Sequence, residues 1–384
     1  MQFNFYTPAQ VRFGWGELKK IGELALPFGR RAFVLIGKNK ERAEILLKLL
    51  QVNGIKYHVF AVSGEPTVEI LENALLSARE NLCDMVIGFG GGSVLDTGKA
   101  VSALLTNSGA MMDYLEVVGK GMAIESPSLP YIAIPTTAGT GTEVTSNAVL
   151  GVPEKGVKVS MRSPYMIPNV AIVDPELTVS VNPEVTAASG LDALTQVLEA
   201  FVSVKANDMV DLLAREGMHR ASRSLRSAYR DGNDQEARSD MSFTALLSGM
   251  ALANAGLGAV HGFAGPLGGM ISASHGAICA CLLPHVMEMN IRVLEEQNPH
   301  SVYLKRYDEV AQILTGDRSA NRFHGVDWVK ELCGDLNIPT LKQLGYSPVQ
   351  AEELIDKSKN SSSMKGNPVK LSGEQMLRIL QNAY

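Results

Sequence analysis

Asp84-Met-Val-Ile-Gly-Phe89-Gly-Gly-Gly-Ser93-Val-Leu-Asp96-Thr-Gly-Lys99 is the segment of this chain whose pattern most clearly indicates a fold class. The apolar run before the glycines predicts a buried strand, and the residues after them predict a helix. Three glycines between a strand and a helix let a phosphate approach the backbone amides at the positive end of the helix. A merely tight turn is the alternative interpretation. The stretch therefore indicates an α/β domain with a candidate phosphate site.

The same alternation of strand and helix patterns extends over residues 30 to 175. We expect strands at 31–36, 56–61, 84–89, 131–134 and 170–173, and helices at 39–52, 69–81 and 93–105. This rhythm predicts a parallel sheet covered by helices. Residues 3–13 alternate large apolar and polar side chains, which predicts an edge hairpin or a strand that pairs with a second subunit.

Strand patterns stop beyond about Pro175. Apolar residues at helical spacing predict helices at 185–204, 208–229, 235–255, 277–294, 302–314, 326–336 and 349–358. We therefore expect a Rossmann-like nucleotide-binding domain over residues 1–178 and an all-helical domain over residues 179–384.

Composition limits the class of protein. The chain has 384 residues, is 46% hydrophobic and 20% charged, and carries a formal net charge of −5. These values fit a soluble two-domain protein and argue against a nucleic-acid partner. The N-terminus lacks a secretory pattern and no long apolar run suggests a membrane span, so we expect a cytoplasmic protein. Cys279 and Cys281 lie in an apolar run and are interpreted as reduced core thiols.

Four residues of the second half suggest a metal site. Asp192 and Gln196 lie one turn apart on one face of a predicted helix. His261 and His275 would be about 21 Å apart on a straight helix. The glycines and proline of residues 265–269 predict a break in the chain there, so both imidazoles could reach one ion. A carboxylate and two imidazoles suit zinc or ferrous iron.

A second loop follows the predicted strand at 131–134. Residues 135–145 contain five hydroxyls and two glycines, which could bind phosphate or ribose oxygens. A threonine-rich loop that caps a helix is the alternative.

Taken in order, these motifs resemble the iron-containing, or group III, alcohol dehydrogenases over nearly the whole chain. The matching segments are 90–99, 135–145, 169–177, 190–203, 256–269 and 282–286. The resemblance implies a dehydroquinate synthase-like fold, with the site in the cleft between a nucleotide-binding α/β domain and a helical domain.

The resemblance also assigns roles to residues. It implies that the pyrophosphate of the cofactor binds at Gly91, Gly92 and Ser93, with Asp96 nearby. Lys158 would reach the nicotinamide ribose, and the rest of the cofactor cleft would be lined by Thr136, Thr137, Thr140 and Thr145. The metal ligands would be Asp192, the residue at position 196, His261 and His275.

Two residues depart from the family pattern. Gln196 stands where most relatives have histidine, and its amide oxygen is a weaker ligand. Three protein ligands with an open position still suffice for a catalytic metal, and related glycerol dehydrogenases look similar in using an aspartate and two histidines. Gly265 replaces a further histidine, which excludes a proton relay there and predicts a roomier pocket for a bulkier substrate. Glu199 could support the metal site or be an ordinary helix charge.

The choice of cofactor depends on the end of the first long strand. An acidic side chain there typically binds the ribose 2'-hydroxyl of NAD. Gly37 removes that acid, and Lys38, Lys40 or Arg42 could meet the 2'-phosphate of NADP. The same basic residues could instead be an ordinary solvated helix start.

We therefore expect an NAD(P)-dependent alcohol dehydrogenase or aldehyde reductase. Asp192, His261 and His275 would hold a divalent iron or zinc ion that acts as a Lewis acid on a small alcohol or aldehyde. The alternatives are a metal-free maleylacetate-type reductase, a lyase resembling dehydroquinate synthase, and a non-catalytic nucleotide-binding relative. A homodimer is expected from the possible N-terminal strand.

Overall fold

The structure is a computed structural model that describes residues 2–384, which form two compact units. The sheet unit contains residues 6–137 and 141–179 and is built on a parallel sheet. The helical unit contains residues 180–384 together with residues 2–5 and 138–140. The loop at 135–145 therefore contributes three residues to the helical unit, although both of its ends belong to the sheet unit.

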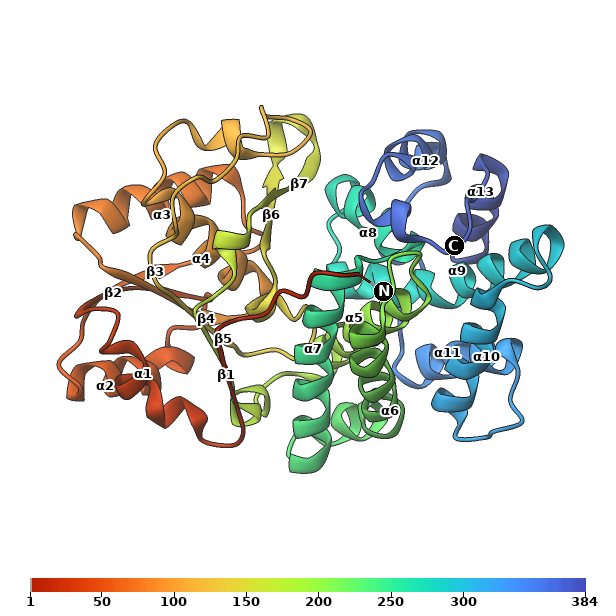
Figure 1. Cartoon of the computed structure of the whole chain (residues 1–384), viewed down its shortest axis with the longest axis horizontal. Helices are drawn as coiled ribbons and strands as arrows, with labels where there is room; N and C mark the ends of the chain where they lie inside the picture. Colours follow the sequence, from red (N-terminus) through yellow and green to blue (C-terminus); the bar gives the residue numbers. More distant parts are fainter. Residues whose placement is uncertain (1) are drawn as a thin grey trace. The chain divides into compact units, whose positions relative to one another are not determined.

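The sheet unit has six parallel strands in the order β1-β8-β5-β4-β2-β3 (Figure 1). They are β1 (Gln10–Phe13), β2 (Arg31–Ile36), β3 (Lys56–Ala61), β4 (Met85–Gly90), β5 (Tyr131–Pro135) and β8 (Val170–Val173). The chain adds β3 on one side of β2 and then returns to add β4 on the other side. The order reverses between β2 and β4, and ligands of such sheets bind at the carboxyl ends of the strands at this point.

Helices cover both faces of this sheet. The helices α1 (Ile21–Ala25) and α2 (Glu44–Val52) lie on one face, and α3 (Val68–Glu80) and α4 (Gly92–Leu104) on the other (Figure 1). Alternate residues of β2 point to the two faces: Phe33 and Leu35 pack in the core under α3 and α4, while Val34 and Ile36 pack in the opposite core. Burial on both faces explains why the inner strands β2, β4, β5 and β8 are nearly continuous apolar runs.

Two features near the ends of the sheet unit differ from the sequence-based prediction. An antiparallel hairpin of β6 (Asn147–Val152) and β7 (Val157–Arg162) was not predicted, because its short strands mix exposed and buried positions. The hairpin predicted for residues 3–13 was wrong. Only β1 forms there, as a parallel edge strand on β8, and Asp174 accepts hydrogen bonds from the amides of Gly16 and Leu18 just after it.

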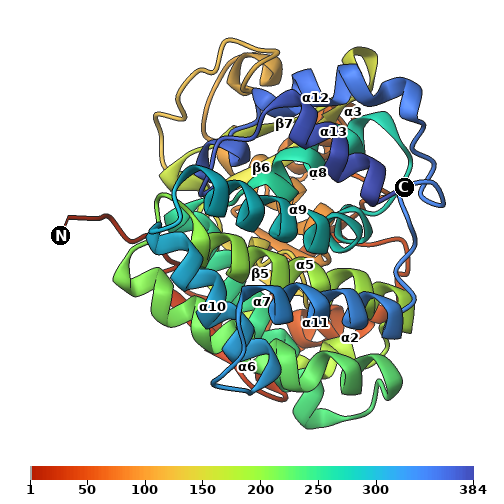
Figure 2. The ribbon, with the colours of Figure 1, turned by 90° about the vertical axis from the view of Figure 1, so that its right-hand side faces the viewer.

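The helical unit consists of nine α-helices over the described residues. They are α5 (Pro183–Val202), α6 (Asp208–Arg230), α7 (Gln235–Ala255), α8 (Ala259–Met270), α9 (His275–Gln297), α10 (Val302–Thr315), α11 (Arg322–Asp335), α12 (Ala351–Lys359) and α13 (Gly373–Asn382). Figure 2 shows α5 in the middle of this unit. Of its 20 residues 15 are buried, which is the pattern of a core helix.

The break predicted at residues 265–269 was wrong, and it lies a few residues later. Helix α8 continues through Pro266 to Met270, and the turn to α9 occupies residues 271–274. A proline inside a helix costs about 3 kcal/mol. Full burial of the neighbouring Phe263 and Leu267 offsets this cost, because a large buried apolar side chain contributes about 1.5–3 kcal/mol. Helix α13 was not predicted either.

One described helix, α9, is by itself long and apolar enough to cross a membrane. Of the segment that meets this criterion, 78% is buried against the rest of the protein, as in the core helix of a globular unit. Helices α7 and α8 meet the criterion only together, and they are bent by 99°.

Candidate metal centre and nucleotide site

Three helices of the helical unit bring together the side chains predicted to bind metal. Asp192 lies in the middle of α5, His261 in the first turn of α8, and His275 is the first residue of α9. The Nε2 atoms of His261 and His275 lie 3.3 and 4.0 Å from Asp192 Oδ1. In a tetrahedral site with bonds of about 2.1 Å the ligand atoms lie about 3.4 Å apart. The three residues therefore have the spacing of a metal site.

The aspartate carries the clearest sign that a cation fits here. Asp192 is 2% exposed, and its Oδ1 is a buried oxygen for which the described residues provide no hydrogen-bond donor. A buried carboxylate oxygen without a partner is costly. A divalent cation between Oδ1 and the two imidazoles would remove this cost, so the residues present fit a metal ion.

Glu199 fixes the orientation of His261. Its Oε2 lies 2.7 Å from His261 Nδ1, and its Oε1 accepts a hydrogen bond of 2.6 Å from the amide of Val260. A carboxylate only accepts, so Nδ1 carries the proton and Nε2 keeps its lone pair for a metal. The carboxylate also satisfies amides at the start of α8. Of the two interpretations of Glu199, the contacts favour the supporting role.

Two carboxylates and a thiol surround His261. Burial alone would lower the pKa of His261, but Cys279 and the two carboxylates beside it raise this pKa well above its usual value. The same groups attract a metal cation.

Gln196 makes hydrogen bonds within the protein at both ends of its amide. Its Nε2 donates to Asp192 Oδ2 over 3.2 Å, and its Oε1 accepts from Ser248 Oγ, also over 3.2 Å. A flipped amide would place oxygen against the carboxylate, which fixes this orientation. Gln196 therefore holds Oδ2 of Asp192, while Oδ1 faces the histidines. A direct bond from Gln196 to metal stays a prediction.

Sequence reasoning missed one member of the cluster. Cys279 is fully buried, as expected for a core thiol, but its Sγ lies 3.6 Å from His275 Nε2 and 3.7 Å from His261 Nε2. The possible ligand atoms of Asp192, His261, His275 and Cys279 all lie within 4.8 Å of one another. The spacing of four between His275 and Cys279 on one helix was the available signal. Cys281, by contrast, donates to the carbonyl of Ala383.

Open space lies beside α8 at Gly265. Apart from its two chain neighbours and the backbone of α8 itself, no atom of the described residues lies within 4 Å of the place where a Cβ would be. A histidine at this position in a relative would therefore fill room that is free here.

The residues predicted to bind phosphate lie at the point of the sheet where the strand order reverses. Gly37 directly follows β2 and Gly91 follows β4, and Ile36 and Phe89 of these two strands are paired. Gly91 precedes the first residue of α4 and has no side chain to cap the helix, so the amides of Gly92 and Ser93 are available to a ligand.

Two threonines of the second loop lie beside this turn. The amide of Thr136 donates to the carbonyl of Gly90, and Thr137 Oγ1 would be 3.3 Å from a Cβ at Gly91. The hydroxyl of Thr137 therefore faces the glycine turn at close range.

Other residues assigned to the cofactor have partners within the sheet unit. Asp96 Oδ1 accepts from Thr142 and lies 3.1 Å from Lys99 Nζ, and Lys99 also donates to Thr145 Oγ1 over 2.7 Å. Asp96 and Thr145 are buried, so this network ties α4 to the segment before β6. Lys158 of β7 lies 3.4 Å from Glu65, and Thr140 belongs to the three loop residues of the helical unit.

The basic residues after β2 are not equivalent. Arg42 donates to the backbone carbonyls of Leu177 and Thr136 over 2.9 and 3.4 Å. It therefore holds two loops of the sheet unit together. Lys38 and Lys40 are exposed and remain the candidates for a 2'-phosphate.

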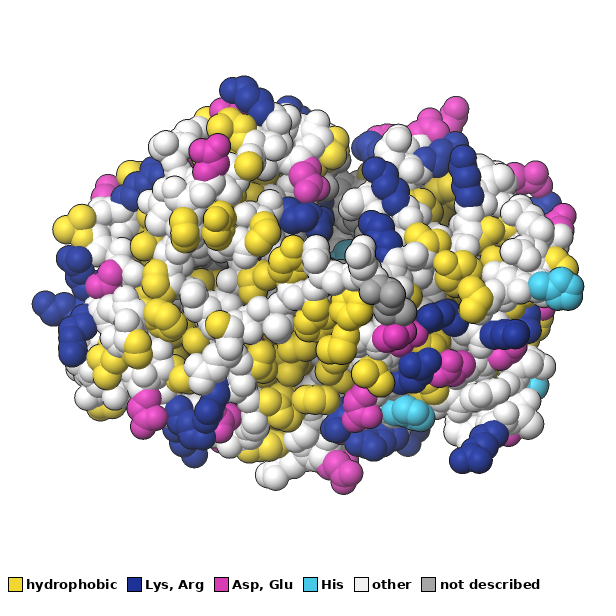
Figure 3. Space-filling view, in the orientation of Figure 1, with side chains coloured by type: hydrophobic (Ala, Val, Ile, Leu, Met, Phe, Trp, Pro, Cys, Tyr) yellow, Lys and Arg dark blue, Asp and Glu magenta, His cyan; other side chains and the backbone are white. Residues whose placement is uncertain are grey.

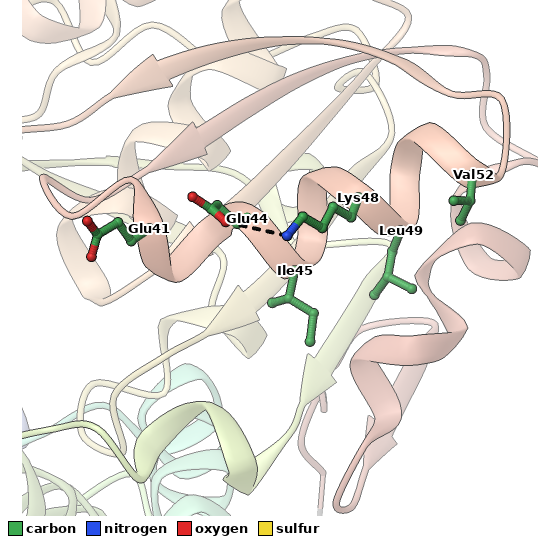
Figure 4. A pocket seen from close by; sticks show the side chains of 6 residues that line it. All are labelled: Glu41, Glu44, Ile45, Lys48, Leu49 and Val52. Atoms are coloured by element: carbon green, nitrogen blue, oxygen red, sulfur yellow. Dashed lines mark hydrogen bonds and ion pairs between the residues drawn. The ribbon is translucent and has the colours of Figure 1, made fainter.

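Among the described residues, a cluster of possible metal-ligand atoms is found at Asp192, His261, His275 and Cys279 alone, and the other surface features are of a different kind. A hollow along α2, shown in Figure 4, is lined by Glu41, Glu44, Ile45, Lys48, Leu49 and Val52. Its charged pair, Glu44 and Lys48, is exposed and 3.5 Å apart. On the face shown in Figure 3, Lys and Arg are interspersed with Asp and Glu, which is not the pattern of a nucleic-acid-binding surface.

Comparisons with known proteins cover both units. A family model described as "Iron-containing alcohol dehydrogenase" matches residues 8–175, and one described as "Fe-containing alcohol dehydrogenase family, C-terminal" matches residues 186–384. Long-chain-alcohol dehydrogenase 1 of Geobacillus thermodenitrificans is 41% identical over 73% of this chain and 71% of its own. Alcohol dehydrogenase 4 of Saccharomyces cerevisiae is 36% identical over 99% and 98%. The structure of sulfoacetaldehyde reductase from Bifidobacterium kashiwanohense in complex with NAD+ has a TM-score of 0.87 and 27% identity, and the match covers 100% of this chain and 99% of that one.

Proposed function

Because this chain belongs to the iron-containing alcohol dehydrogenase family, we propose that it interconverts an alcohol and an aldehyde or ketone with NAD(P)(H) and a divalent metal. The carrying observation is that His261 and His275 both lie beside a buried carboxylate oxygen of Asp192 for which the described residues provide no hydrogen-bond donor. When bound, the metal supplies Lewis acidity and the dinucleotide carries the hydride.

The protein residues bind and orient these groups. Asp192, His261 and His275 hold the metal, and Glu199 keeps Nε2 of His261 free for it. Gly91, Gly92 and Ser93 bind the pyrophosphate through their amides. Gly265 offers no side chain that could accept a proton, so the proton of the substrate hydroxyl would pass to water or to a ribose hydroxyl of the cofactor. The open space beside Gly265 supports substrates with bulk near that point.

NAD(H) is the proposed cofactor, with NADP(H) accepted as well. The sulfoacetaldehyde reductase of similar structure was solved with NAD+. In the present chain Gly37 brings no carboxylate to the end of β2, and the exposed Lys38 and Lys40 do not repel a 2'-phosphate. Gly37→Asp should lower kcat/KM with NADP(H) more than with NAD(H), since like charges would then meet. An equal fall of kcat/KM with both cofactors would show that the adenosine ribose does not bind beside Gly37.

We further propose a soluble, cytoplasmic homodimer. Strand β1 lies at the edge of the sheet and pairs with β8 on one side, so its other side can meet a second copy. Light scattering of the purified protein tests the dimer, and a monomer would overturn it.

Chelation and a ligand variant test the metal. We expect His275→Ala and exhaustive chelation each to abolish turnover of an alcohol series, followed by nicotinamide absorbance. Zinc or ferrous iron should restore the chelated native protein only. His219→Ala is the control, because His219 is exposed on α6. Turnover that survives both treatments would overturn the metal part and favour a metal-free reductase. Dinucleotide binding without turnover of any substrate would overturn the catalytic function.

A further inference from the structure

We propose that Cys279 is the fourth protein ligand of the metal, so that this chain holds its ion with one carboxylate, two imidazoles and a thiolate. The inference rests on the metal site of the proposed function and adds a ligand that the family resemblance does not supply. It takes the place of the histidine that is missing at position 196.

The distances are those of a thiolate ligand. In a tetrahedral site with a metal–sulfur bond of about 2.3 Å and a metal–nitrogen bond of about 2.05 Å, sulfur and nitrogen lie about 3.6 Å apart. Sγ of Cys279 lies 3.6 Å from His275 Nε2 and 3.7 Å from His261 Nε2. One thiol thus has the expected separation from both imidazoles at once, and the helix that places His275 also places Cys279 one turn later.

The neighbouring oxygen points to the same ion. Asp192 Oδ1 lacks a hydrogen-bond donor among the described residues and shares the cluster within which all four ligand atoms lie less than 4.8 Å apart. A cysteine that served only as a core thiol would need neither this oxygen nor two imidazole nitrogens beside it. A cation accounts for all four groups together.

Gln196 is not free to serve as the fourth metal ligand. Both ends of the Gln196 amide have hydrogen-bond partners, and ligation through Oε1 would turn the amide away from Asp192 and Ser248. The amide therefore orients the aspartate, and the missing donor comes from α9 instead of α5.

A thiolate changes the chemistry of the site. Cysteine binds as the thiolate, so loading of a divalent ion breaks the S–H bond, forms the metal–sulfur bond and releases one proton to solvent. The two negative ligands neutralise the charge of the ion. Thiolate is a soft donor and favours zinc or ferrous iron over hard cations such as magnesium. Substrate oxygen can still enter, because catalytic zinc sites expand to five ligands.

X-ray absorption of the zinc-loaded, full-length protein tests the ligand without reference to activity. We expect one sulfur scatterer at about 2.3 Å in addition to nitrogen and oxygen. Cys281→Ser is the matched control, since Cys281 lies on the same helix and donates to Ala383; the sulfur shell should persist in it and disappear in Cys279→Ser.

Cobalt loading gives an independent signature. Native protein and Cys281→Ser should show the near-ultraviolet charge-transfer band of a cobalt–thiolate bond, and Cys279→Ser should lack it. Zinc affinity of Cys279→Ser, from competition with a chromophoric chelator, should fall at least about tenfold. Bound zinc with only nitrogen and oxygen neighbours in the native protein would overturn Cys279 as a ligand and leave the metal site intact. Native protein that retains no stoichiometric metal would overturn both, and neither outcome requires that a variant folds.

Discussion

Gln196 lies one turn after Asp192, where the family resemblance leads one to expect a histidine ligand. Its Nε2 donates to the aspartate while its Oε1 accepts from Ser248, and Cys279 offers the metal ligand that the amide does not. Residues 196 and 279 thus lie on different helices but affect one property, the affinity of the site for metal. Their effects should be coupled, because a site that already has four donors gains little from a fifth.

A double-mutant cycle measures this coupling. Gln196→His in the Cys279→Ala background should restore zinc affinity by about tenfold or more, whereas in the native background the gain should be less than about threefold. Competition titrations with a zinc chelator give all four affinities. Equal gains in the two backgrounds would mean that the two positions act independently, which contradicts a shared fourth position.

Glu143 is a second residue whose chemistry is set by burial. It is 2% exposed, and burial raises its pKa from the usual 4.5 to about 7, against the opposing effect of Lys99. Below pH 4.5 both folded and unfolded chains keep the proton. Between pH 4.5 and 7 the unfolded chain loses it first, so the free energy of unfolding falls as pH rises and levels off above 7.

Glu143→Gln should abolish this fall in the free energy of unfolding, because the amide has no proton to release. The variant should gain stability relative to the native protein between pH 5 and pH 8, by at most about 3 kcal/mol. Thermal unfolding at the two pH values checks the sign, and the exposed Glu154→Gln serves as control. A stability difference between variant and native protein that does not change with pH would show that Glu143 titrates normally.

At the scale of elements, close packing of α4 against the sheet sets the glycine turn. Tyr131 of β5 is buried between Gly88 of β4 and Gly98 of α4, and its hydroxyl donates to the carbonyl of Leu95. A Cβ at Gly98 would lie 2.6 Å from this hydroxyl oxygen, and one at Gly88 would lie 2.3 Å from it. The two glycines therefore determine how closely α4, and with it Gly92 and Ser93, approaches β4.

Gly98→Ala should lower the free energy of unfolding by about 1–3 kcal/mol and weaken dinucleotide binding, because the helix must shift. Adding Tyr131→Phe should restore only a small part of the lost stability, since it removes the oxygen but leaves two ring carbons that would lie 2.7 and 2.8 Å from the new Cβ. Chemical denaturation and a binding titration measure the two effects. Gly37→Ala is the control for stability, because there is open space at Gly37. Full stability of Gly98→Ala alone would refute the packing argument.

The helices and strands also differ in how well the sequence predicts them. The β2 and β4 strands and helices such as α7 follow from uniform apolar patterns, and the start of α4 was fixed by its glycines. Helix α8 escaped prediction because it contains Pro266 and several glycines and exists only through tertiary packing, which overrides local propensity. Cys279 was not predicted as a metal ligand, because a core thiol and a buried metal ligand both have apolar neighbours along the chain. Only the approach of α5 and α8 distinguishes them.

On the scale of the whole molecule, the two ligands are predicted to bind to different units. Asp192, His261, His275 and Cys279 all lie in the helical unit, with its own hydrophobic core. Gly37, Gly91, Gly92 and Ser93 lie in the sheet unit between two further cores. Each ligand should therefore stabilise chiefly the unit that holds its residues.

Hydrogen exchange with and without bound ligands tests this division. A metal present at 100 times its dissociation constant stabilises the state that binds it by about 2.7 kcal/mol. Chelation should therefore speed exchange in α5 and in the first turns of α8 and α9, and leave β2 and β4 nearly unchanged. Addition of NAD+ to the chelated protein should slow exchange at the turn from β4 to α4. Equal acceleration by chelation in both units would show that they open as one cooperative block, and the metal would then stabilise the sheet as much as the helices that hold it.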